Sequence, residues 1–333
     1  MIVGCVLGGG LASYGISGFP AARPEISFAP EKLIEEPIVK DFVGLGPIYL
    51  VNTLPTLGVT ILLLWLIVFL TNRSLKKSQN SDLVPRGIGN VMEGLLEIIY
   101  NMTEGSAGAK WAKIIFPWFA TIMIYVLFAN LLKLIPGFES IGVLHPAHGE
   151  GHTIQQLGTI FGKEIVNILP AQVEEGGYIL APYFRGVSVD LNFTVSLAIV
   201  AVIAVQVIGI RAQSFGYLKK FFNFGNVFKV PFFGVIDLLM GFLELILEFF
   251  KIISFAFRLF GNMFAGVALV AIASSLIGFI SIVPAMLFLF ELFVGVIQAF
   301  VFGILTMVFM VMATAGHGHE EEHVEAQPEV HEI

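Results

Sequence analysis

Five polar or charged residues lie at helical spacing in an otherwise apolar stretch near the carboxyl end of the chain. They are Glu244, Glu248, Lys251, Arg258 and Asn262, which are separated by 4, 3, 7 and 4 residues. At about 100° per residue, these separations keep all five on one face of a single helix. Ionisable groups at membrane depth are costly, at about 2.5–3.5 kcal/mol each for Arg, Lys or Asp, so such a face must meet protein or water. The pattern is typical of a path for ions through a membrane.

Arg258 is the charge in this stretch whose counter-charge we expect on another element. The 32 residues that follow it, through Phe290, carry no charge. An arginine stays protonated at physiological pH, so it acts as a fixed charge and does not carry protons. Beside a moving carboxylate it favours the ionised form and repels a passing proton, which makes it a gate between two aqueous routes. For Glu248 and Lys251, a pair that only neutralises a helix end or reaches the lipid headgroups is an alternative.

A second helix is expected to return alongside the first. Gly278 and Pro284 are the natural places for the apolar run to reverse direction. A turn centred near Gly278 puts Arg258 and Gln298 at equal distance, 20 residues each, so that the two face each other. Glu291 shares a face with Gln298, seven residues later, and the two could extend a hydrogen-bonded path toward Arg258. The alternative is that Glu291 is a buried carboxylate satisfied within a helix pair.

The composition is that of a membrane protein. Of 333 residues, 56% are hydrophobic and 13% are charged, and the mean hydropathy is +0.88. A soluble domain would carry roughly 25% charged residues, so a soluble enzyme is disfavoured. The net charge of −7 comes mostly from the tail 316–333, which holds six Glu and no Lys or Arg. The single cysteine, Cys5, excludes an internal disulfide.

The hydropathy pattern predicts an all-α polytopic membrane protein with about five membrane-embedded helices and one amphipathic surface helix. The expected spans are residues 48–70, 111–135 and 190–210, followed by a long charged hairpin over 231–315, and the surface helix covers 87–108. Four Lys or Arg residues follow the first span and four follow the third. Because short cytoplasmic loops collect Lys and Arg, these ends face the cytoplasm, the amino terminus lies outside and the carboxyl terminus lies inside.

Three regions are expected along the chain. Residues 1–47 form an outer arm, in which 1–19 resemble part of a signal or a lipid-attachment segment, 48–315 form the membrane domain, and 316–333 form an acidic, His-containing tail. The polar excursion 137–189 suits the outer side. Its residues His145, His148 and His152 have helix-compatible spacing and could bind a metal, with a solvated loop as the alternative. No metal site is assigned.

Three sequence motifs identify a family. They are Arg258-Leu259-Phe260-Gly261-Asn262-Met263-Phe264-Ala265-Gly266 with Gln298-Ala299-Phe300 downstream, Phe128-Ala129-Asn130-Leu131-Leu132 with Ile135-Pro136, and Ser188-Val189-Asp190-Leu191-Asn192-Phe193-Thr194. Together they resemble subunit a of bacterial F-type ATP synthases. The resemblance covers roughly residues 48–315.

The resemblance implies a proton-translocating stator with two offset half-channels against a rotating ring of c subunits. Arg258 occupies the family's essential arginine position, and Asn262, Gln298 and Glu291 fall on channel positions. The implied outer and inner openings involve the following residues: Asp190 and Asn192 outside, Glu244 and Ser254 inside. The implied partners are the c ring, b-type peripheral stalk subunits, the rest of the synthase and membrane lipid, with no nucleic acid and no cofactor. The implied location is the plasma membrane of a bacterium.

Two features qualify the resemblance. Many members carry an acid or a histidine directly after the Ala-Gly pair, where this chain has Val267, and the family alternates between His and Glu at the position of Glu291. The inward-leading half-channel is therefore expected to depend on Glu291, Asp190 and water.

The chain contains no phosphate-binding motif of the form GxxxxGK[ST]. Nucleotide chemistry is therefore assigned to partner subunits, and this chain is expected to have no catalytic site of its own.

Two other classes of protein remain as alternatives. A stand-alone secondary transporter could use an intramembrane arginine to hold an anionic substrate, although no duplicated halves are visible in the sequence. A structural membrane scaffold could use the buried charges only to fix helix packing. Co-purification with a c ring would distinguish a synthase subunit from a stand-alone transporter. A neutral substitution of Arg258 would distinguish it from a scaffold, because a scaffold would tolerate the substitution.

Overall fold

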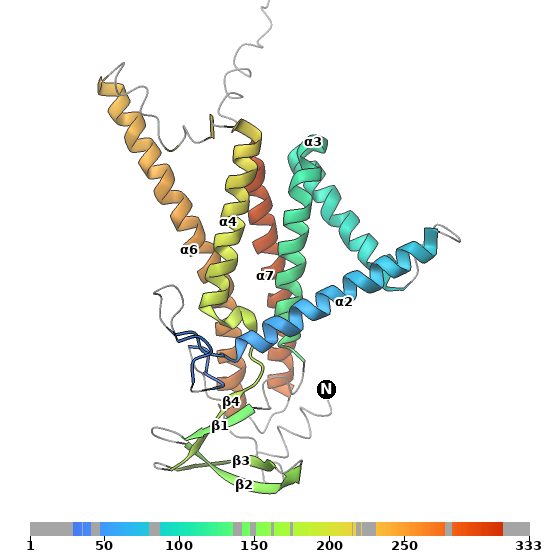
Figure 1. The fold of residues 1–333 in the computed structure, drawn as a ribbon, viewed down its shortest axis with the longest axis vertical. Helices are drawn as coiled ribbons and strands as arrows, with labels where there is room; N and C mark the ends of the chain where they lie inside the picture. Colours follow the sequence, from blue (N-terminus) through green and yellow to red (C-terminus); the bar gives the residue numbers. More distant parts are fainter. Residues whose placement is uncertain are drawn as a thin grey trace, which may run out of the picture. The chain divides into compact units, whose positions relative to one another are not determined.

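The protein is built mainly from long helices (Figure 1). The structure, a computed structural model, describes residues 29–34, 36–40, 47–79, 87–135, 142–146, 151–160, 163–173, 176–214, 216–217, 221, 231–276 and 282–315. The helices are α2 (Thr53–Gln79), α3 (Ile88–Leu132), α4 (Leu191–Gln213), α6 (Pro231–Leu276) and α7 (Ile282–Thr314). The segment 1–19 and the acidic tail 316–333 lie outside the described residues.

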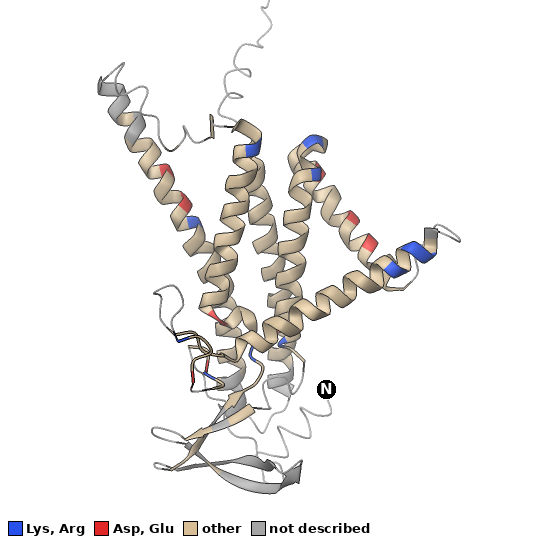
Figure 2. Cartoon of the chain, viewed as in Figure 1, with Lys and Arg blue, Asp and Glu red and all other residues tan. Residues whose placement is uncertain are grey.

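Four helical segments in the described part of the chain are long and apolar enough to cross a membrane. They are Thr53–Ser78, Ile88–Leu132, Leu191–Gln213 and Met286–Thr314. Helix α6 has 46 residues, or about 69 Å at about 1.5 Å per residue, which is more than twice the thickness of a bilayer core of about 30 Å. Figure 2 shows α4 and α7 almost without charge, since they carry only Arg211 and Glu291 respectively. The prediction of an all-α polytopic membrane protein is confirmed.

Helix α3 contains both the predicted surface helix and the predicted second span. The two arms meet at Gly108, whose φ of 71° and ψ of 160° are not helical (Figure 1). A positive φ of this size favours glycine, because a Cβ would be strained there. The bend therefore falls at residue 108, where the sequence predicts that the surface helix ends.

Helix α2 begins five residues later than the predicted span. Residues before it pair with the outer arm through antiparallel bridges between Lys32 and Val51 and between Val39 and Ile48. Because the backbone groups of this segment bond the arm, they are not free to form the first helical turn. The ammonium of Lys32 also lies 3.7 Å from the centre of the Tyr49 ring, which fixes the arm further.

The polar excursion forms a four-stranded antiparallel sheet. Its strands are β1 (Gly142–Pro146), β2 (Gly151–Ile160), β3 (Lys163–Val173) and β4 (Tyr178–Pro182), in the order β1-β4-β2-β3. His145 lies in β1 and His152 in β2, so the helical spacing considered for the histidines does not hold. His148 lies outside the described residues. Among the described residues, no group of three or more His, Cys, Asp or Glu side chains could hold a metal.

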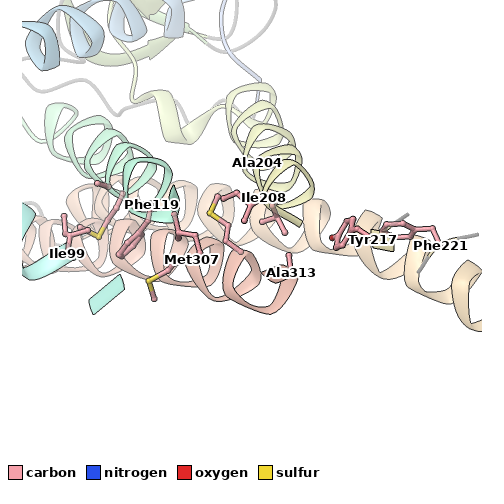
Figure 3. Close-up of a cluster of buried hydrophobic side chains, with 13 residues drawn as sticks. Ile99, Phe119, Ala204, Ile208, Tyr217, Phe221, Met307 and Ala313 are labelled. Atoms are coloured by element: carbon pink, nitrogen blue, oxygen red, sulfur yellow. The ribbon is translucent and has the colours of Figure 1, made fainter. Parts of the chain in front are cut away.

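The chain divides into two compact units, and each helix contributes to both. The first consists of residues 1–66, 125–194 and 258–299, and the second of residues 67–124, 195–257 and 300–333. In the second unit, apolar side chains of α3, α4 and α7 point toward one another (Figure 3). Phe119, Ile208 and Met307 belong to this cluster and are at most 3% exposed.

Close helix packing in this cluster depends on Gly303 of α7. A Cβ at position 303 would lie 2.8 Å from Cβ of Met123 and 2.9 Å from Cε2 of Phe119, both on α3. Real Cβ atoms do not approach other atoms this closely, so any larger residue would have to displace its neighbours.

We therefore predict that Gly303→Ala destabilises the protein by about 1–3 kcal/mol through overpacking. Gly58→Ala is the matched control, because Gly58 is also helical and a Cβ there meets nothing within 4 Å. In the control, the higher helix propensity of alanine adds up to about 1 kcal/mol of stability. Thermal unfolding of the purified protein in detergent measures both, and an equal shift in the two variants would contradict the packing argument.

Candidate functional site

A buried ion pair joins the end of α3 to α7 in the first unit. Lys133 Nζ lies 2.6 Å from Glu291 Oε1, and the two side chains are 2% and 8% exposed. Lys133 directly follows α3, and Glu291 is the one charged residue in the sequence of α7. Removing one partner of a buried pair leaves an uncompensated charge and typically costs about 3–5 kcal/mol.

The Glu291 carboxylate also approaches α6 closely, at Gly266. A Cβ at position 266 would lie 3.2 Å from Glu291 Oε1 and 3.3 Å from its Cγ. The next residue, Val267, is half-buried and offers no polar group. The ionic partner of Glu291 is therefore Lys133, which follows α3. The family pattern would place a polar side chain on α6 instead, at position 267.

Asn130 links three elements through hydrogen bonds. It is completely buried, and its Nδ2 donates to the carbonyl oxygen of Gly295 in α7 at 3.0 Å. Its Oδ1 accepts a bond of 2.6 Å from the hydroxyl of Ser188, in the short 3-10 helix η2 (Val187–Val189). Both polar atoms of this buried side-chain amide thus have a hydrogen-bond partner. The polar contacts extend from η2 to α7, the helix that carries Glu291.

Asp190 lies at the amino terminus of α4. One carboxylate oxygen accepts a bond of 2.9 Å from the backbone N–H of Asn192, which is the capping arrangement for a helix that begins at Leu191. The other accepts a bond of 2.8 Å from the Thr53 hydroxyl at the start of α2. Asp190 is buried, whereas the Asn192 side chain is exposed.

Gln298 of α7 bonds to α6 one helical turn beyond Arg258. Its Oε1 accepts a bond of 2.6 Å from Asn262 Nδ2, and the midpoint of positions 262 and 298 is 280. The centre predicted from the sequence is Gly278. The antiparallel pair is therefore centred two residues after the predicted position. Gln298 is 3% exposed, and its Nε2 is buried without a hydrogen-bond partner among the described residues.

From Arg258 onward, helix α6 has one exposed face and one buried face. The exposed residues are Arg258, Asn262, Ala265, Leu269 and, nearer the end of the helix, Ile272. The buried residues are Leu259, Phe260 and Met263. The spacing of 4, 3, 4 and 3 residues in the exposed set follows the helical repeat, so Arg258 lies on a continuous outward stripe.

The charged residues earlier in α6 belong to the second unit. Glu248 is 8% exposed, and its Oε1 lies 2.8 Å from Lys251 Nζ. The same ammonium lies 4.8 Å from the ring centre of Phe309. Glu244 is half-buried, and Ser254 is exposed. The structure thus places Glu248 and Lys251 in a pair within one helix.

Tyr217, which follows α4, lies in the same unit as these carboxylates. It is 2% exposed, and a Cβ at Gly209 would lie 2.5 Å from its ring. Burial, together with the Glu248 and Glu244 carboxylates, raises the pKa of Tyr217 to about 12. The phenol therefore stays neutral at physiological pH and adds no charge to this region.

Sequence reasoning missed Lys133, Thr53 and Ser188 as members of the polar network. Lys133 is 158 residues from Glu291 in the chain, so helical spacing could not connect them. A signal was present: Lys133 is a lone cation between Leu132 and Leu134 at the predicted outer end of a span, where the positive-inside rule does not expect one.

Comparison with known proteins gives a consistent result. The sequence model of the family described as "ATP synthase A chain" matches residues 54–311. The ATP synthase subunit a of Helicobacter pylori (strain Shi470) is 29% identical over 249 residues, which cover 73% of this chain and 85% of that protein. The ATP synthase subunit a of Acidothermus cellulolyticus is 27% identical over 246 residues, which cover 73% of this chain and 71% of that protein.

The capping role of Asp190 can be separated from its charge. We predict that Asp190→Ala lowers the stability by about 0.5–2 kcal/mol, because the cap of α4 is lost along with the acceptor for Thr53. Asp190→Asn should keep most of the stability, since its side-chain oxygen can still cap the helix. Thermal unfolding in detergent is the measurement, and an alanine variant as stable as the asparagine variant would refute the capping role.

Proposed function

Because the chain belongs to the ATP synthase A chain family, the proton-translocating subunits of the synthase membrane sector, we propose that it forms two offset half-channels beside a rotating c ring. Each proton reaches a ring carboxylate through one half-channel and leaves through the other. Arg258 separates the two half-channels as a fixed positive charge. The chain thereby couples proton flow to rotation, and the alternatives of a stand-alone transporter or a scaffold are not favoured by the family.

The exposure of Arg258 is the observation that carries this proposal. In the isolated chain, Arg258 is exposed. It lies on a stripe of α6 that continues with Asn262 and Ala265. A polar face at membrane depth is more favourable against protein or water than against lipid, so an exposed stripe that carries Arg258 and Asn262 suits a protein surface. A ring helix with a carboxylate fits the stripe, because it supplies the opposite charge and can approach the small Ala265 closely.

The inward-leading half-channel is proposed to follow the polar network of the first unit. Asp190 and Asn192 lie at its outer opening, and Glu291, Gln298 and Asn262 continue it toward Arg258. The buried Gln298 Nε2, which has no hydrogen-bond partner among the described residues, can donate to a water in this path. The second half-channel is proposed to pass Glu244 and Ser254.

Partners and placement follow from the same proposal. The chain works with the c ring, with b-type peripheral stalk subunits and with the rest of the synthase, in the plasma membrane of a bacterium. Its amino terminus lies outside and its carboxyl terminus lies in the cytoplasm, with residues 48–315 as the membrane domain between an outer arm, 1–47, and a tail, 316–333. Nucleotide chemistry takes place in partner subunits, so the chain has no catalytic site of its own.

We predict that Arg258→Ala abolishes ATP-driven proton pumping and ATP synthesis in membrane vesicles while the complex still assembles. Without the fixed charge, a ring carboxylate is no longer held ionised as it passes between the half-channels. Arg258→Lys should also be damaging, because a compact ammonium does not reproduce a planar, permanently charged fork. Near-normal coupled pumping in the alanine variant would refute the proposed function.

A cross-linking experiment tests the proposed face. In a Cys5→Ser background, Ala265→Cys should form a disulfide with a cysteine placed beside the ring carboxylate of the c subunit. Leu62→Cys is the matched control, because Leu62 is 67% exposed but lies on α2. Cross-linking that is equal at both positions, or absent at position 265, would contradict the assignment of this face to the c ring.

A further inference from the structure

We propose that Lys133 is a positioning residue of the proton route, which holds the Glu291 carboxylate against Gly266 as half of a neutral pair. This inference rests on the proposed function, because it assigns Lys133 to the same route. The sequence motif that includes Asn130 lies on both sides of Lys133, as Phe128–Leu132 and Ile135-Pro136, and does not include the lysine, so the resemblance alone gives it no role.

Two observations place Oε1 of Glu291. It lies 2.6 Å from Lys133 Nζ, and it occupies space that a side chain at position 266 would need, since a Cβ there would lie 3.2 Å away. Gly266 therefore leaves room for the carboxylate beside α6, and the ammonium of Lys133 is the charged group that holds it there. With 2% of the Lys133 side chain exposed, water cannot replace it as the counter-charge.

The aliphatic stem of Lys133 packs where a larger residue than Gly186 would intrude. A Cβ at Gly186 would lie 3.0 Å from Lys133 Cδ and 3.1 Å from its Cβ. Gly186 directly precedes η2, whose Ser188 bonds Asn130, three residues before Lys133. The buried stem, the hydrogen bond beside it and the ion pair at its head suit a group that positions another.

The pair also explains how Glu291 functions without a polar residue at Val267. A carboxylate in an apolar helix such as α7 needs a compensating charge nearby. Lys133 supplies it from the end of α3, so α6 can keep an apolar residue at position 267 and a bare Gly266 against the carboxylate.

The test is a double-mutant cycle in the intact synthase. The variants are Lys133→Met, Glu291→Gln and the double variant, and the measured quantity is ATP-driven proton pumping in membrane vesicles at matched ATP hydrolysis, per assembled complex. Each single variant is expected to lose about tenfold or more, because a stranded or misplaced group disrupts the route. The double variant should pump about fivefold or more above the product of the two single effects.

Lys113→Met is the matched control, since Lys113 is an exposed lysine of α3, the helix that Lys133 directly follows, and it should pump as the parent does. Additive losses, or unchanged pumping in Lys133→Met, would overturn the inference. Losses confined to the amount of assembled complex would also overturn it, because a merely structural pair lowers assembly and leaves the pumping per complex unchanged.

Arg258→Ala, measured in the same membranes, distinguishes a failure of the proposed function from a failure of the role of Lys133. If Arg258→Ala pumps normally, the proposed function itself fails. If Arg258→Ala is inactive and the Lys133 and Glu291 effects are additive, the function stands and only the role of Lys133 is wrong.

Discussion

A charge inside a bilayer has to be met by an opposite charge or by water, and this constraint organises the polar residues of the chain. Lys133 meets Glu291 across two elements at 2.6 Å, and Lys251 meets Glu248 within α6 at 2.8 Å. Each of these two ion pairs supplies the opposite charge within this chain. Arg258 lies on the exposed stripe of α6, which is the surface that we propose faces the c ring.

Close approach of backbones is the second requirement, because polar side chains must reach each other between packed helices. Glycines provide it at the places where the polar or apolar contacts are tightest. Gly266 admits the Glu291 carboxylate, Gly186 admits the stem of Lys133, and Gly303 lets α7 pack on α3. Hydrogen bonds of Asn130 and Asp190 then fix the ends of η2 and α4 to their neighbours.

The helices could be predicted from the sequence because long apolar runs have few alternatives in a membrane. The bend at Gly108 falls where the amphipathic pattern ends, and the face that carries Arg258 and Asn262 follows from helical spacing alone. The sheet of residues 142–182 was not predicted, because its alternation is weak and its residues pair over loops of variable length.

Contacts between distant segments were the part that spacing could not supply. The Lys133–Glu291 pair spans 158 residues, and no periodic pattern reports on such a distance. Spacing predicts Arg258 opposite Gln298, whereas Gln298 bonds Asn262, four residues later, so the centre of the pair lies two residues from the predicted one. The predicted centre depends on Gly278 and Pro284, which mark a turn but do not report the contacts of the helices.

The most direct measurement is a density map of the assembled complex in lipid that resolves the side chain of Arg258. We expect a guanidinium that projects from the exposed stripe of α6 toward a carboxylate of a neighbouring ring subunit. A guanidinium that points into lipid headgroups, or that is held by an acid of its own chain with no ring beside it, would contradict the account.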